Sequence, residues 1–432
     1  MTSHKHLKAA VRARMARTGE RYTTARRQLT GPPVLVRADV VPGYRTFGGG
    51  RHHDTALLTH VLEAAGVTAA HDGQALDEPM VAGLTGGIGF MYFSFSYAGH
   101  LPTMTIVPRI HPRPFLLGAL ERAGLPHRVA ETTSATKAAR ELAAALDAGR
   151  TPLCTVDRAG LPHQRWADSI AGADPYDVVV AGRRGTTLLL DDEGLDPVEV
   201  PADVFAAARA AHRKSRHRMV VVEPASAPVD LVPAIRASLA VTVHDLVQDV
   251  MAGNFAGNFG LRGMAKWADA VGDRRSRTGW ARLFDSGPAF GHAMRRLHDC
   301  LTFDHSSPGA MHLLYADFLT AAADVVGDPA LGEAAALYER AGVLWSEIAD
   351  AAVTGPLAAY RGLAERRMEL QLGGGSGEDL RALADQVEAL TAGLDVSETD
   401  RLATLDTVAG LAAQVLPLER EGCAVLAGAA TG

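Results

Sequence analysis

Apolar residues recur at helical spacing in the first half of the chain, most clearly at 54–65. One face of this predicted helix is apolar and carries Leu57, Leu58, Val61, Leu62 and Ala65. Asp54 is suited to cap the N-terminus of the helix, and Gly66 is suited to end it. The same kind of spacing predicts further helices over 76–84, 134–148 and 201–212.

Short runs rich in β-branched and aromatic residues predict strands between these helices, at 90–95, 152–156, 176–182, 187–191 and 218–223. The runs 176–182 and 187–191 are separated by a short turn at 183–186, and this spacing predicts a β-hairpin. Within 31–223 the predicted helices come mostly first and the predicted strands mostly later. That order favours an α+β domain over a doubly wound parallel sheet.

The pattern changes after residue 223. Proline, alanine and serine at 224–229 predict a linker. Beyond it the apolar spacing is helical, and helices are predicted from 231 and near 279–301, 308–326, 329–353, 355–372, 377–393 and 398–416. The sequence therefore predicts an all-α domain at 230–432 that follows the α+β domain at 31–223.

Length and composition narrow the class of protein. With 432 residues, of which 47% are hydrophobic, the chain is long enough for two domains with packed cores. It has no run of the ~18–20 apolar residues that span a bilayer, so we expect no membrane association. Three cysteines, Cys154, Cys300 and Cys423, form no CxxC pair, which argues against a disulfide framework and a thiolate zinc site. We expect a cytoplasmic protein without a metal or other cofactor.

The net charge of −6 is unevenly distributed along the chain. Residues 1–30 carry eight Lys and Arg against one acid, Glu20, so this basic arm has a charge of +7 and the remainder −13. Such an arm can dock on an acidic carrier protein or another polyanion, or pack along its own acidic body. The acidic remainder argues against nucleic acid as the main partner.

A glycine-rich loop at 48–50 leads into the helix at 54–65 and delivers His52 and His53 to its N-terminus. The free N–H groups and the dipole of a helix N-terminus disfavour positive charge, so we expect a lowered histidine pKa here. Cysteine enzymes hold a thiolate at such a position, but the nearest cysteine in this chain is Cys154. Neighbouring side chains on an extended chain point apart, so a metal site made by the two histidines is the weaker alternative.

A second glycine cluster comprises Gly86, Gly87 and Gly89. It lacks the preceding strand and the following acid of a dinucleotide-binding site. Two interpretations are open: a tight turn that lets backbone approach backbone, or a loop whose N–H groups line a substrate pocket. The Walker, HExxH and GxSxG motifs are absent from the sequence.

Three blocks of sequence resemble the domain family named for butirosin biosynthesis protein H. The first is Gly-Arg-His-His-Asp-Thr-Ala-Leu-Leu at 50–58, where the family has His-Cys before a helix. The second, at 76–93, matches an acid followed by Gly-x-x-Gly-Gly-x-Gly-Phe and an aromatic. The third joins Tyr-Asp-Val-Val-Val-Ala-Gly at 176–182 to Leu-Asp-Asp at 190–192.

This resemblance implies a papain-like first domain, similar to that of cysteine peptidases, and an acyltransferase or cyclase of bacterial specialised metabolism. In the family an aminoacyl group passes from a carrier-protein thioester to an amine of an aminoglycoside, through a thiolate activated by a histidine that an aspartate orients. The implied partners are a small-molecule acyl acceptor and a carrier protein that meets the basic arm. Whether the protein forms a homodimer is left open. The second half resembles the helical domain of unknown function that often accompanies this module, at 258–269 and 314–319.

The sequence departs from the family at the reactive positions. His53 occupies the cysteine position, Asp177 occupies the histidine position with Tyr176 beside it, and the acid is Asp191 or Asp192. Three explanations are open: His53 is a general base with Asp177 as its partner, the domain has lost catalysis and kept a binding or scaffold role, or the correspondence is shifted by a residue or two. The candidate catalytic residues are His52, His53, Asp177 and Asp191, and the candidate substrate-binding residues are Gly86, Gly87, Gly89, Tyr92 and Tyr176.

Overall fold

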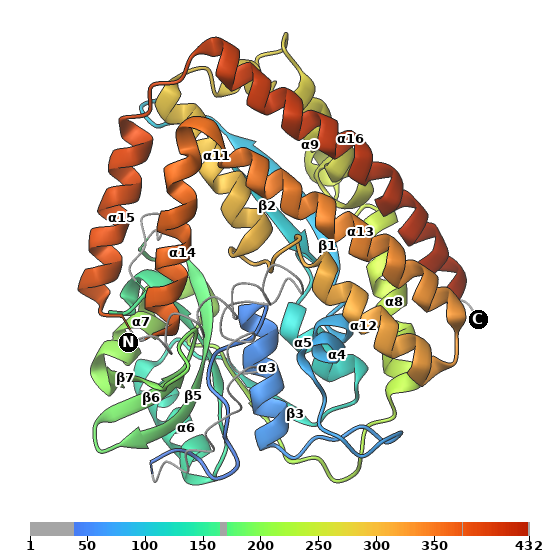
Figure 1. The fold of residues 1–432 in the computed structure, drawn as a ribbon. Helices are drawn as coiled ribbons and strands as arrows, with labels where there is room; N and C mark the ends of the chain where they lie inside the picture. Colours follow the sequence, from blue (N-terminus) through green and yellow to red (C-terminus); the bar gives the residue numbers. More distant parts are fainter. Residues whose placement is uncertain (1–38, 165–170, 374, 431–432) are drawn as a thin grey trace, which may run out of the picture. The chain divides into compact units, whose positions relative to one another are not determined.

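The computed structural model describes residues 39–164, 171–373 and 375–430, so the basic arm at 1–30 lies outside the described residues. The chain forms two compact units, and each is built from segments that are distant in the sequence (Figure 1). The first unit contains the described residues up to Glu78, Gly124–Asp230 and Ala364–Gln386, and the second contains Pro79–Ala123, Leu231–Leu363 and the residues from Val387 onward.

A six-stranded antiparallel sheet forms the centre of the first unit, in the order β3-β8-β4-β5-β6-β7. Its strands are β3 (His127–Ala130), β4 (Leu153–Asp157), β5 (Pro175–Arg184), β6 (Thr187–Asp191), β7 (Val198–Pro201) and β8 (Met219–Val222). The predicted hairpin at 176–191 is confirmed as the pair of β5 and β6. This sheet, with helices on its faces, confirms the predicted α+β class.

Helices cover both faces of this sheet. Helices α6 (Ala135–Asp147) and α7 (Ala202–Ala211) share one buried apolar cluster with alternate residues of β4, β5 and β6. Val178 and Val180 belong to that cluster, so Asp177 and Val179 between them face the other side, because successive strand residues alternate. On that side, α3 (His53–Ala64) contacts β4 and β5. The N-terminus of α3 is thereby brought to the first residues of β5.

The second unit is mainly helical. Its first segment contains most of α4 (Glu78–Leu84), the antiparallel pair β1 (Ile88–Phe95) and β2 (Thr103–Arg109), and α5 (Phe115–Arg122). Its other helices are α8 (Leu231–Val247), α9 (Gly260–Gly272), α10 (Trp280–Leu283), α11 (Gly287–Thr302), α12 (His312–Val326), α13 (Pro329–Ala352) and α16 (Glu398–Ala429). Helices α14 (Ala358–Leu372) and α15 (Gly377–Ala392) have residues in both units. The prediction that the chain is helical after the linker is confirmed.

The segment 79–123 lies in the second unit, although the sequence analysis assigned it to the domain at 31–223. The reason is packing between distant parts of the chain: β1 contacts α9, and β2 contacts α11. Phe90 of β1 stacks on Trp345 of α13, with ring centroids 5.7 Å apart. These apolar contacts tie the hairpin to helices that follow it by more than 150 residues.

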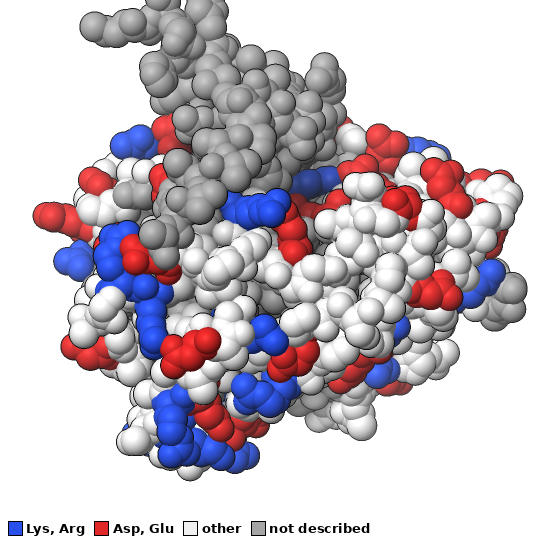
Figure 2. All heavy atoms as spheres, turned by 90° about the horizontal axis from the view of Figure 1, so that it is seen from below, with Lys and Arg blue, Asp and Glu red and all other residues white. Residues whose placement is uncertain are grey.

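Figure 2 shows Lys and Arg interspersed with Asp and Glu over the face seen there. Among the described residues, no helix has both the length and the hydropathy required to cross a bilayer.

Helical glycines in the second unit provide a test of its packing. A Cβ atom at Gly83 in α4 would lie 2.1 Å from the ring of Phe318, whereas one at Gly332 in α13 would meet nothing within 4 Å. We expect Gly83→Ala to lower the free energy of unfolding by about 1–3 kcal/mol, as overpacked cores do. Gly332→Ala should raise it by about 0.4–1 kcal/mol, because alanine restricts the unfolded chain. Urea unfolding of both variants is the measurement, and equal effects would contradict this packing.

Candidate active site

The loop before α3 is shaped by its glycines. Gly48 and Gly49 have φ values of +50° and +79°, which favour glycine. A Cβ at Gly50 would lie 2.1 Å from the Cβ of Ala56. The backbone N–H of Gly48 donates to Asp191 Oδ1 at 2.7 Å, so the end of β6 holds the loop in place. This arrangement fixes where α3 begins.

His52, and not Asp54, is the N-cap of α3. Its backbone is extended, and its Nδ1 accepts a hydrogen bond from the backbone N–H of Thr55 at 3.3 Å, as a capping oxygen would. Glu78 accepts from the backbone N–H groups of Arg51 and His52 at 2.8–2.9 Å. His52 is only 1% exposed, so its side chain caps the helix and is not accessible to a substrate. Asp54 lies in the first turn, where the helix dipole favours a negative charge.

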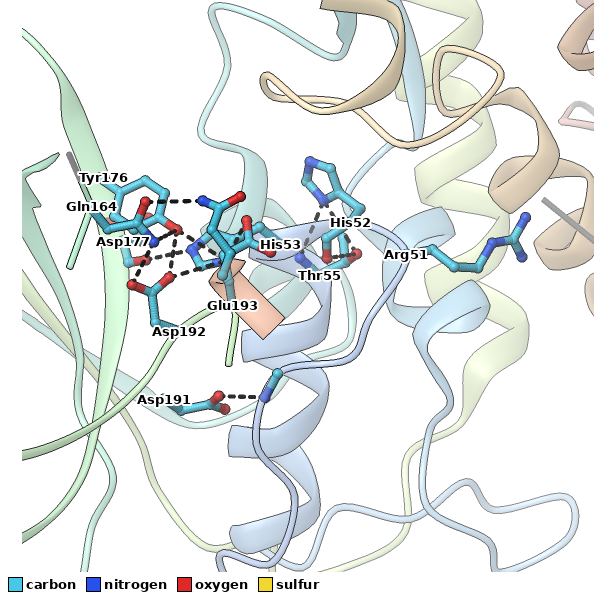
Figure 3. Close-up of polar contacts among 12 residues, drawn as sticks. Arg51, His52, His53, Thr55, Gln164, Tyr176, Asp177, Asp191, Asp192 and Glu193 are labelled. Carbon is cyan, nitrogen blue, oxygen red and sulfur yellow. Dashed lines mark hydrogen bonds and ion pairs between the residues drawn. The ribbon is translucent and has the colours of Figure 1, made fainter. Parts of the chain in front are cut away.

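His53 is the first residue of α3, and its imidazole ring lies flat against the ring of Tyr176 (Figure 3). The ring centroids are 4.5 Å apart, with an interplanar angle of 10°. Nε2 lies 2.8 Å from the carbonyl oxygen of Asp177, so this nitrogen carries a hydrogen and donates it. Nδ1 lies 3.4 Å from the Tyr176 hydroxyl, 3.7 Å from Asp192 Oδ1 and 3.8 Å from Glu193 Oε1. The His53 side chain is 9% exposed.

The contact predicted between His53 and Asp177 is present, but it runs through the main chain. The carboxylate of Asp177 instead accepts from the hydroxyl of Thr155 at 2.6 Å. Tyr176 and Asp177 are consecutive residues of β5, so their side chains point to opposite faces of the sheet. The side chain stacked on His53 is that of Tyr176, although Tyr176 lies on the same face of β5 as Val178, which α6 and α7 cover.

Asp192 is the acid beside this stacked pair. Its carboxylate has no exposed surface and accepts hydrogen bonds from Tyr176 at 2.5 Å, from His163 Nε2 at 2.7 Å and from Gln164 Nε2 at 2.9 Å. Burial acts against ionisation, but the hydrogen bond and charge of His163 outweigh it and hold the Asp192 pKa well below its usual range. Asp192 is therefore an anion fixed at the His53 site.

Asp191 has a different position from its neighbour. It accepts from the hydroxyl of Tyr44 at 2.5 Å and contacts His60 Nδ1 at 2.7 Å, besides binding the backbone of Gly48. These contacts anchor α3 and its preceding loop to β6. Of the two acids that the sequence left open, Asp192 is the one beside His53.

The pKa of His53 is raised, so the expectation of a lowered value is wrong. Burial lowers it, but the charges of Glu193, Asp192 and Asp54 raise it, with help from the hydrogen bond to the Asp177 carbonyl. The carboxylates thus outweigh burial. Burial and the charge of Asp192 raise the pKa of Tyr176 well above its ordinary value, so its hydroxyl stays neutral.

The raised pKa of His53 predicts a pH-dependent contribution to stability. A folded-state pKa above the ordinary 6.5 gives stability that is fully present below pH 6.5 and is lost as the pH rises through the folded-state value. We expect His53→Gln to reduce the free energy of unfolding more at about pH 5.5 than at about pH 9, measured by urea unfolding. The exposed histidine His71 provides the control: at about pH 5.5, His71→Gln should cost less stability than His53→Gln, because its ion pair with Asp72 is exposed. An equal loss for His53→Gln at both pH values would contradict the assignment.

Three residues at this site were not singled out from the sequence: His163, Gln164 and Glu193. Glu193 directly follows the two aspartates at the end of β6, so its position in the sequence was a usable signal. His163 and Gln164 lie in a loop between β4 and β5 and follow no periodic pattern. Only the fold brings them to Asp192.

Gly86, Gly87, Gly89 and Tyr92 belong to the second unit, whereas the residues around His53 belong to the first. A Cβ at Gly87 would lie 2.2 Å from the ring of Tyr315, and one at Gly89 would lie 2.7 Å from the Arg109 carbonyl oxygen. Tyr92 is 2% exposed and accepts a hydrogen bond from Trp280 Nε1 at 2.8 Å. Close packing within the second unit thus accounts for these residues, as the tight-turn interpretation expects.

The described residues include neither an exposed thiol nor a cluster suited to a metal ion. All three cysteines are buried, and burial raises the pKa of Cys154 and Cys300 and that of Cys423 to about 11. A buried thiol with a raised pKa is a poor nucleophile. Within the described part of the chain, no group of three or more His, Cys, Asp or Glu residues is arranged to hold a metal ion.

Comparison with known proteins finds a match for one part of this chain, and that part contains His53. No curated protein matches the chain. A family model, described as butirosin biosynthesis protein H, N-terminal, matches residues 52–193. The match begins at the cap of α3 and ends at Glu193, so it includes His53, Tyr176 and Asp192. Residues 52–193 of this chain therefore resemble the N-terminal region of butirosin biosynthesis protein H, a family whose name points to antibiotic biosynthesis.

Proposed function

We propose that this protein acts in antibiotic biosynthesis as an acyltransferase that forms an amide from an activated acyl group, without a cysteine nucleophile. The family match over 52–193 supports the role in biosynthesis. One observation carries the finer assignment: at the family's cysteine position stands a partly exposed histidine, His53, whose Nδ1 is directed at Tyr176, Asp192 and Glu193.

The reaction would require one group that takes up and returns a proton. An amine nitrogen attacks the carbonyl carbon of a thioester, a C–N bond forms and the C–S bond breaks. The proton of the attacking nitrogen passes to Nδ1 of a neutral His53 and then to the departing thiolate. The Asp177 carbonyl holds the hydrogen on Nε2, so Nδ1 is the nitrogen that exchanges a proton. A histidine pKa above 6.5 suits this exchange near neutral pH.

The charge around His53 supports an amine as the acceptor. Glu193, whose side chain is 18% exposed, and Asp54 add negative charge beside the imidazole. A small molecule that carries several amines, such as an aminoglycoside, would keep protonated groups for these carboxylates to attract. We further propose that the basic arm at 1–30 meets an acidic carrier protein that holds the acyl donor.

The test is a turnover assay with the full chain. An acyl N-acetylcysteamine thioester serves as donor and an aminoglycoside or a diamine as acceptor, and mass spectrometry follows the amide. We expect amide formation above the rate without protein, and a rate that rises with pH as His53 loses its proton. Absence of amide with every acceptor, under conditions in which the acceptors bind, would overturn the enzymatic assignment.

A second candidate function is a binding protein that has kept the fold without catalysis. The observation in its favour is that His53 makes no hydrogen bond to Asp192, which accepts from Tyr176 and His163, while Nε2 of His53 is held by the Asp177 carbonyl. Under this alternative an aminoglycoside would bind and no amide would form, so the same assay separates the two functions.

A further inference from the structure

A pocket lies in the first unit between α6, α7 and the turn that joins β5 to β6. This turn is at the end of β5 opposite to Tyr176, so the pocket is separate from the His53 site. Its volume is about 170 Å³. Six alanines and three leucines make up most of its lining, which also includes Gly185, Arg183, Arg209 and His217. None of the lining residues is acidic.

Arg209 is the unusual residue of this pocket, because it is a buried cation that pairs with no carboxylate among the described residues. Its side chain is 3% exposed. One guanidinium nitrogen donates to the carbonyl oxygen of His217 at 2.5 Å, and the other donates to that of Ala138 at a long 3.4 Å. Nε is buried and has no acceptor. Guanidinium groups have five N–H donors, so this one keeps donors without partners among the described residues.

The other two polar lining residues do not supply a counter-charge. Arg183 is exposed and pairs with Asp147, whose carboxylate lies 2.5 Å away at the surface. Burial and the charge of Arg209 lower the pKa of His217, so this imidazole is neutral at pH 7. An uncompensated charge in an apolar environment is costly. The pocket therefore combines an apolar wall with one cation that a bound anion would satisfy.

We propose that this pocket binds a small monocarboxylate with an apolar body, whose carboxylate pairs with Arg209. Guanidinium and carboxylate form strong charge-assisted hydrogen bonds, often bidentate. A cavity of about 150 Å³ lined by apolar residues is known to hold benzene, so the present volume suits a ring or a short aliphatic chain. Benzoate and hexanoate have these dimensions and this charge.

Isothermal titration calorimetry of the full chain with benzoate tests the proposal, with benzyl alcohol as the neutral ligand of similar shape. We expect benzoate to bind at least tenfold more tightly than benzyl alcohol and inorganic phosphate. Equal affinity for benzoate and benzyl alcohol would show that the carboxylate charge does not contribute to binding. Equal affinity for benzoate and phosphate would show that the apolar wall does not contribute. Either result, or no benzoate binding at millimolar concentrations, overturns the proposal.

Two variants locate the site. Arg209→Met should weaken benzoate binding at least tenfold and leave benzyl alcohol binding nearly unchanged. Ala206→Leu fills the pocket from α7 without touching the charge, and it should abolish the binding of both ligands. Arg184→Ala, at an exposed arginine outside the lining, is the control and should bind like the parent protein. If circular dichroism shows that Arg209→Met is unfolded, Ala206→Leu decides: unchanged benzoate binding in that variant overturns the proposal.

Discussion

Replacement of Asp192 by alanine should lower the free energy of unfolding by about 3–5 kcal/mol, the usual cost of removing one partner from a buried charged network. The carboxylate is fully buried and accepts hydrogen bonds from Tyr176, His163 and Gln164. Alanine would remove the short acceptor of the tyrosine hydroxyl and of the glutamine amide, and would leave each with one long contact, at 3.4 Å to His53 Nδ1 and at 3.3 Å to the Tyr176 hydroxyl. His163 would lose its charged partner as well.

The measurement is urea unfolding of Asp192→Ala beside a matched control at the surface of the same unit. Asp147 pairs with Arg183, and both side chains are about half exposed. Asp147→Ala should therefore cost at most about 1 kcal/mol, as exposed ion pairs do. If the two variants lost the same stability, the network around Asp192 would not be the anchor that its geometry indicates.

Replacement of His53 by alanine should reduce the rate of amide formation by about 10²–10⁴-fold, the typical contribution of a positioned proton-transfer group. The reason is that Nδ1 of His53 is the atom at this site that can take up and release a proton, whereas the Tyr176 hydroxyl keeps its proton. The side chain of His53 is 9% exposed, so its loss should cost less stability than the loss of Asp192.

The rate is measured with the thioester donor and the amine acceptor by mass spectrometry. His71→Ala is the matched control, because His71 lies in the same unit and is exposed. It should react at the parent rate. A His53→Ala variant that also reacts at the parent rate would show that proton transfer takes place elsewhere.

Local patterns predicted much of the fold. The helix expected at 54–65 is α3 at His53–Ala64, because its apolar spacing reflects real burial against the sheet. Its cap was missed, because histidine is not a usual capping residue and only the backbone shows that His52 takes this position. The last helix continues to Ala429 past Pro417, whereas the sequence pattern ended it at 416. The helix α9 was also missed.

The candidate site was only partly predictable, for physical reasons. The glycine loop and the aspartates after β6 drew attention to His53 and Asp192, because both lie at the ends of regular elements. Whether the side chain of Tyr176 or of Asp177 meets His53 depends on how the N-terminus of α3 packs against the start of β5, and that packing is not encoded in the local pattern. His163 reaches Asp192 from an irregular loop, so it has no periodic signal. From its place in the sequence, we assigned segment 79–123 to the domain at 31–223. Its contacts with helices far along the chain instead place it in the second unit.

We propose that acyl transfer by this protein passes through no covalent intermediate on the protein, because His53 stands where a cysteine would act and all three cysteines are buried. The most direct measurement is the intact mass of the protein during turnover, first with the thioester donor alone and then after addition of the amine acceptor. We expect an unchanged protein mass throughout and an amide that appears only after the acceptor is added. A protein that gains the mass of the acyl group and loses it when the acceptor arrives would contradict direct transfer assisted by His53.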